Sequence, residues 1–137
     1  MYSLSEMSSR YFENAVRRLG QLGVNFRQAK GNVLYVPLRR GVSYGYRVAP
    51  NHSWSVGHVF SVVTGKKDRA ALHVDDYGKP EHFPEYGAAA SYDPIHVDGS
   101  PGVRHFADAL LSRAVNQEFL ESLRRLQSPL VAQGGEL

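Results

Sequence analysis

The chain has 137 residues, of which 42% are hydrophobic and 21% charged, and its formal net charge is +3. This length and composition are typical of one folded domain with its own core and exclude a wholly disordered polypeptide. The absence of cysteine excludes disulfides, thiolate metal sites and a cysteine nucleophile. Because no apolar run is long enough for a membrane span and no signal-peptide pattern opens the chain, we expect a soluble, cytoplasmic protein without a membrane partner.

The first predicted element is a helix that begins at Ser3. Ser3 and Glu6 have the spacing of a capping box, in which both side chains satisfy backbone groups at a helix start. Apolar residues then recur every three or four positions, as expected for one buried helical face: Leu4, Met7, Tyr11, Ala15, Leu19 and Leu22. Gly20 or Gly23 is predicted to end the helix.

From Val24 to about Val63 the hydrophobic period changes to two, which predicts successive antiparallel strands. The expected strands cover residues 33–38, 42–48, 56–63 and 70–76, and the last two are predicted to form a hairpin. Tyr44 and Tyr46 share one face of the second of these strands, and Arg47 lies on the other face. Residues 77–94 predict a long loop, and a short strand is expected at 95–98.

A second helical pattern begins at Ser100 and Pro101, which suit the N-cap and first helical positions. The apolar stripe extends to about Gln127, either in one helix or with a separate last helix capped by Asn116. We therefore predict one α+β domain over residues 1–128, followed by a flexible tail at 129–137. Its antiparallel sheet of four to six strands is expected to be flanked by an N-terminal and a C-terminal helix.

Charge is divided unevenly along the chain. Residues 1–70 hold eleven Lys and Arg against three acids, a formal +8, whereas residues 71–137 hold five against ten, a formal −5. Cations bind phosphates, and aromatic rings such as Tyr35 can stack on unpaired bases. The leading prediction is therefore that the N-terminal half binds nucleic acid or another polyanion, with the turn cations at one end of the sheet. The residues predicted to bind are Arg39, Arg40, Arg47, Lys66, Lys67 and Arg69. The alternative is that these cations belong to solvated hairpin turns, and that Tyr44 and Tyr46 fill the core beneath the helices.

A second hypothesis is an enzyme. The tripeptide H-V-D occurs at His73–Asp75 and at His96–Asp98, and His58 lies on the preceding predicted strand. Residues two apart on a strand share a face, so these imidazoles and carboxylates would meet in one site if the strands pair. Such a site would be that of an acid–base or metal-assisted hydrolase, such as a nuclease. The same spacing is typical of any half-solvated strand. No catalytic or metal-binding motif decides whether the chain is an enzyme, and none identifies a cofactor.

The third hypothesis is an interaction module without catalysis. The opposite charges of the two halves can pair a basic surface with an acidic one, which favours a homo-oligomer or another protein partner. Phe83, Tyr86 and Tyr92 in the predicted loop are of the aromatic type that anchors protein interfaces. Their exposure would separate this role from packing on the core.

Overall fold

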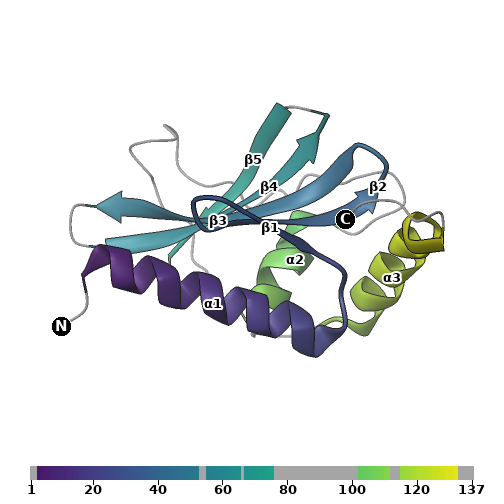
Figure 1. Cartoon of the computed structure of the whole chain (residues 1–137), viewed down its shortest axis with the longest axis horizontal. Coiled ribbons are helices and arrows are strands. Elements are labelled where there is room, and N and C mark those ends of the chain that lie inside the picture. The colour runs from purple at the N-terminus through teal and green to yellow at the C-terminus, as the bar shows by residue number, and fades with distance from the viewer. Residues whose placement is uncertain (1–2, 53–54, 66, 76–101, 112–114, 133–137) are drawn as a thin grey trace.

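The computed structural model describes residues 3–52, 55–65, 67–75, 102–111 and 115–132 (Figure 1). A helix, α1 (Leu4–Leu22), precedes the strands β1 (Arg27–Ala29), β2 (Val33–Arg39), β3 (Val42–His52), β4 (Ser55–Thr64) and β5 (Lys67–Val74). Two helices follow, α2 (Val103–Leu110) and α3 (Gln117–Ala132). Each strand pairs antiparallel with its neighbour in the order β1-β2-β3-β4-β5, and Figure 1 shows the three helices on one side of the sheet. The predicted α+β class and antiparallel sheet are confirmed.

The ends of α1 and the start of α3 follow from local side-chain chemistry, whereas the N-cap of α2 is Gly102 and not the predicted Ser100, and it makes no side-chain cap hydrogen bond. Ser3 is the N-cap of α1, and its Oγ accepts a hydrogen bond of 3.1 Å from the backbone N–H of Glu6. Gly23 ends the helix in the left-handed region at φ 69°, where glycine carries no steric cost. Asn116 Oδ1 accepts hydrogen bonds from the backbone N–H groups of Glu118 and Phe119, at 2.9 and 3.4 Å. The C-terminal apolar stripe is thus divided between two helices, with the last one capped by Asn116.

The C-terminal end of α3 differs from the sequence prediction, which placed a flexible tail from residue 129. The helix includes Pro129 and continues to Ala132. Proline leaves the carbonyl group four residues earlier without its helical N–H partner. Because Pro129 is exposed and lies in the last turn, water can reach that carbonyl group, and the helix continues past the proline. Residues 133–137 lie outside the described part of the chain.

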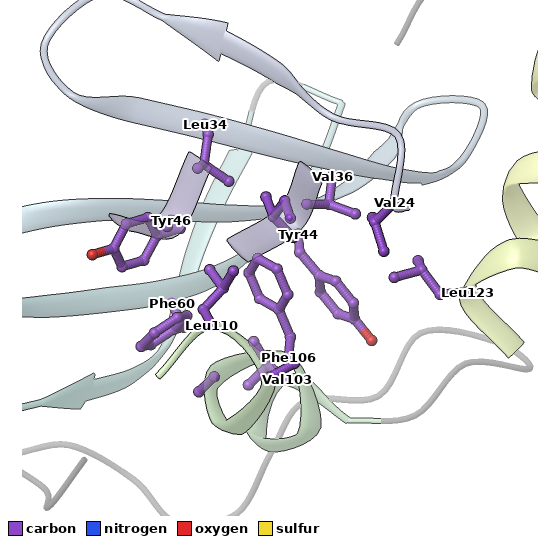
Figure 2. Packing of buried hydrophobic residues seen from close by; sticks show 14 of the residues in the cluster. Val24, Leu34, Val36, Tyr44, Tyr46, Phe60, Val103, Phe106, Leu110 and Leu123 are labelled. Atoms are coloured by element: carbon purple, nitrogen blue, oxygen red, sulfur yellow. The ribbon is translucent and has the colours of Figure 1, made fainter. Parts of the chain in front are cut away.

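The main core lies between the sheet and the helices (Figure 2). Tyr44 and Tyr46 of β3 are 0% and 2% exposed, so the tyrosines fill the core beneath the helices, as one alternative predicted. The Tyr44 ring stacks on Phe106 of α2 with centroids 4.7 Å apart and an interplanar angle of 14°. Phe60 of β4 meets Phe106 edge-on at 5.7 Å. Burial of each large side chain stabilises the fold by about 2–3 kcal/mol, so these rings hold α2 against the sheet.

The opposite face of the sheet, called here the helix-free face, is also partly buried. Ala49 and Val59 form a second small apolar cluster there, and Ser61 is buried on the same face of β4. Gly45 pairs with Ser61 across β3 and β4. A Cβ atom at Gly45 would lie 2.6 Å from Ser61 Oγ, so glycine at this position allows the two strands their close packing.

Helix α3 is joined to the N-terminal half of the chain by polar contacts. The Gln127 side chain accepts a hydrogen bond from Asn25 N at 3.1 Å and donates to the carbonyl groups of Asn25 and Pro37, both at 2.9 Å. Arg124 Nη2 donates to the Leu22 carbonyl group at 2.7 Å. Gln127 is 2% exposed, so these bonds are shielded from water. They fix α3 beside β2 and the end of α1.

Candidate functional site

The structure brings two basic turns together at one end of the sheet. Val42 at the start of β3 pairs with Thr64 at the end of β4, and Gly65 N donates a hydrogen bond of 2.8 Å to the Gly41 carbonyl group. Gly41 and Gly65 have φ values of 78° and 62°, which glycine adopts readily in turns. We call residues 39–42 and 64–69 the basic end. Its sequence holds five cations against one acid, a formal +4.

Two of the predicted binding residues at the basic end, Arg39 and Arg40, have exposed side chains. Residues 67–69 are described by their backbone, in which Lys67 pairs with Thr64 and Arg69 pairs with Val62. Lys66 lies outside the described residues. The register therefore places the two basic segments on neighbouring strands, at the same end of the sheet.

Arg47 lies elsewhere. It is in the middle of β3, where it pairs with Val33 on one side and Val59 on the other, and its half-buried side chain is on the helix-free face. Tyr35 of β2 lies on the same face, with the Arg27 guanidinium 4.5 Å from its ring centroid. Arg47 is thus grouped with Arg27 and Tyr35 on the helix-free face and is separate from the basic end.

The histidines and aspartates of the hydrolase hypothesis are not brought together in the part of the chain that the structure describes. His58 pairs with Val74 and contacts Tyr11 of α1, whereas His73 pairs with Val59 on the helix-free face. The two buried imidazoles are on opposite faces of the sheet. A β-bulge between Phe60 and Ser61 shifts the register of β4 against β5 by one residue and so separates the two histidines. Ser61 pairs with Ala70, and the same register continued without the bulge would set His58 opposite His73.

The remaining members of that hypothesis give no shared site. Asp75 follows β5 and is half-buried, and His96 and Asp98 lie outside the described residues. Within the described ranges, no group of three His, Asp or Glu side chains is arranged to hold a metal ion. Phe83, Tyr86 and Tyr92, which the interaction hypothesis used, also lie outside those ranges. No helix in the described structure is both long and apolar enough to span a membrane.

A pocket of about 300 Å³ lies between α1, α2 and the strands β3 and β4. Buried side chains form its floor: Ala15, Tyr46, His58 and Leu110. Polar side chains of α1 form its mouth: Asn14, Arg17, Arg18 and Gln21. Tyr11 and Leu111 complete the described lining.

The floor of the pocket contains a polar pair. Tyr46 Oη and His58 Nδ1 are 2.7 Å apart and share a hydrogen bond. The Tyr11 ring packs against the imidazole in a T-shaped arrangement, with centroids 5.2 Å apart and an interplanar angle of 66°. The hydrogen bond to Tyr46 and the contact with Tyr11 hold the His58 ring, which is 3% exposed, in a fixed orientation.

The sequence interpretation did not identify this pocket, although part of its signal is visible in the sequence. Asn14, Arg17, Arg18 and Gln21 recur at three- and four-residue spacing, so they form a continuous polar stripe without an acid on α1. Such a stripe is usually solvated. Its position beside Tyr46 and His58 depends on how α1 and α2 pack on the sheet, which the sequence pattern does not specify.

Comparison of the chain with models of known protein families, with characterised proteins and with solved structures finds no match. The two candidate sites differ in what their geometry can bind. The basic end offers exposed cations on turns, which suits an extended polyanion. The pocket offers enclosed polar groups, which suits a small molecule.

Proposed function

We propose that the chain binds the phosphate backbone of a nucleic acid through the basic end of its sheet. The hydrogen bond between Gly65 N and the Gly41 carbonyl group carries the proposal, because it joins two separate basic segments into one surface. Arg39 and Arg40 are exposed there, and Lys66, Lys67 and Arg69 belong to the adjoining segment. Cations on turns can reach phosphates without rearranging the sheet.

The spacing of the turns suits a phosphate backbone. Neighbouring strands lie about 4.8 Å apart, so the β2–β3 and β4–β5 turns are centred about 10 Å from each other. The phosphates of one strand wind around the helix axis, so consecutive phosphates are separated by more than their axial rise of about 3.4 Å. The two turns would therefore contact phosphates about one or two nucleotides apart on the same strand.

Binding through the basic end would be largely independent of base sequence. Contacts from Arg and Lys to phosphates position a protein on nucleic acid, whereas contacts to base edges specify the sequence. Tyr44 and Tyr46 are buried in the core and cannot stack on bases. Arg27 already covers one side of the Tyr35 ring. The expected signature is thus an affinity that depends strongly on salt and weakly on sequence.

Fluorescence anisotropy with labelled single-stranded and duplex DNA and RNA, over a salt series, would test the proposal. If four or five phosphates are neutralised, the logarithm of the binding constant should fall against the logarithm of salt with a slope of about −3 to −4.5. The double substitution Arg39→Gln and Arg40→Gln should reduce that slope by about 1.5 to 2. Its matched control is Arg10→Gln with Arg125→Gln, which removes the same charge from exposed positions on α1 and α3.

Two results would contradict the proposal. One is no binding to any of the nucleic acids at low salt. The other is an equal loss in both double variants, because that would show attraction to the overall charge and not to the basic end. Inorganic polyphosphate is a further probe, and tight binding to it without binding to nucleic acid would identify a different polyanion as the partner.

A further inference from the structure

The pocket between α1, α2, β3 and β4 is a second site that the proposed function does not use. None of its described lining residues belongs to the basic end. Tyr46 and His58 point from the sheet toward the helices, whereas the basic end is formed by the turns at one end of the sheet. A ligand of this pocket would thus bind independently of a nucleic acid at the turns.

The floor of the pocket differs chemically from the core around it. Phe60 and Val62 are the next residues of β4 on the same face as His58, and both are buried apolar side chains. Burying a hydroxyl or an imidazole costs free energy that an apolar side chain does not require. The hydrogen bond between Tyr46 and His58 offsets that cost. The pair thus gives the floor of the pocket a hydrogen-bonded, aromatic character that the neighbouring apolar core lacks.

The mouth of the pocket is positively charged. Arg18 Nε donates to the Ala109 carbonyl group at 3.2 Å, which holds the Arg18 side chain against α2. Arg17 Nη1 donates to Asn14 Oδ1, also at 3.2 Å. Each contact uses one of the five N–H donors of a guanidinium. Among the described residues that line the pocket, none carries a carboxylate.

We propose that this pocket binds a small organic anion with one aromatic ring. Its carboxylate or phosphate group would be held at the mouth by Arg17 and Arg18, because guanidinium groups bind both oxyanions with paired hydrogen bonds. The ring would lie in the pocket between the partly exposed side chains of Tyr11 and Leu111, above the floor formed by the buried Tyr46 and His58. The volume of about 300 Å³ is at the lower end of the range of small-molecule pockets, which suits a ligand with one ring.

Phenyl phosphate and benzoate are the probes, and benzyl alcohol is the neutral control. Titrations followed by amide nitrogen–proton correlation spectra should show saturable shifts at residues 11–21 and 109–111 with at least one anion, and weaker shifts with the alcohol. Arg17→Gln removes one charge from the mouth, and Gln21→Glu adds a carboxylate to it. Both residues are exposed, so the fold should persist, and each substitution should weaken anion binding about fivefold or more.

The matched controls make the same changes outside the pocket. Arg125→Gln and Gln28→Glu alter exposed residues of α3 and β1 and should change the affinity less than about twofold. The proposal is overturned if neither anion gives a saturable shift up to about 10 mM. It is also overturned if benzyl alcohol binds as well as the anions, or if the control substitutions weaken binding as much as those at the mouth. Arg39→Gln with Arg40→Gln should leave the pocket titration unchanged, which separates this test from that of the basic end.

Discussion

Replacing Gln127 by leucine should destabilise the protein strongly without altering its surface. The side chain makes two hydrogen bonds with the half-buried backbone of Asn25 and one with the buried Pro37 carbonyl group. Loss of the two bonds to Asn25 costs about 1 kcal/mol each, or less where water replaces them. The Pro37 carbonyl group would be left buried without this partner, which costs about 1–3 kcal/mol. We expect a loss of about 3 kcal/mol in the free energy of unfolding.

Urea unfolding followed by circular dichroism measures this loss. The midpoint should fall while the slope of free energy against urea stays constant, because the same surface is exposed on unfolding. In thermal unfolding the midpoint should fall by about 10 °C. The control is Gln117→Leu in the first turn of the same helix, where the side chain is exposed. A Gln127→Leu protein within about 0.5 kcal/mol of this control would refute the role assigned to the three hydrogen bonds.

Two further substitutions test the packing of the sheet and the start of the last helix. Gly45→Ala should cost about 1–3 kcal/mol because its Cβ would lie 2.6 Å from Ser61 Oγ, and Ser61→Ala in the same chain should restore about 1 kcal/mol. Simple additivity of the two changes in a urea double-mutant cycle would contradict that contact. Asn116→Ala removes the acceptor for two backbone N–H groups at the start of α3 and should cost about 1 kcal/mol, whereas Asn116→Asp should cost little. Equal unfolding midpoints for the alanine variant and the wild type would show that the cap contributes nothing.

The sequence predicted the elements well where the controlling contacts are local. The Ser3 cap needs only its neighbour Glu6, and the left-handed end of α1 needs only Gly23. Alternation likewise predicted that Tyr44 and Tyr46 share a face. Which face the helices cover depends on tertiary packing, and the structure places both tyrosines beneath α1 and α2.

The candidate sites were harder to predict because they depend on strand register. At the basic end, turn-forming glycines mark both segments, and the pairing of Val42 with Thr64 brings them together. His58 and His73 show the opposite outcome, because one bulge reverses the side on which a histidine lies. Alternation within a single strand carries no information about such a bulge. The pocket is further from prediction still, since it depends on the placement of two helices.

The attachment of α3 also sets the order in which the molecule can be assembled. Each strand of the sheet follows its pairing partner in sequence, so each hairpin forms by closing a short loop. The hydrogen bonds from α3 to Leu22 and Asn25 span 102 residues. Closing a loop of that size costs about 2 kcal/mol more chain entropy than closing one of ten residues. During synthesis, α1 and the sheet can therefore form first, with the side of β2 that α3 covers still exposed until α3 leaves the ribosome and docks.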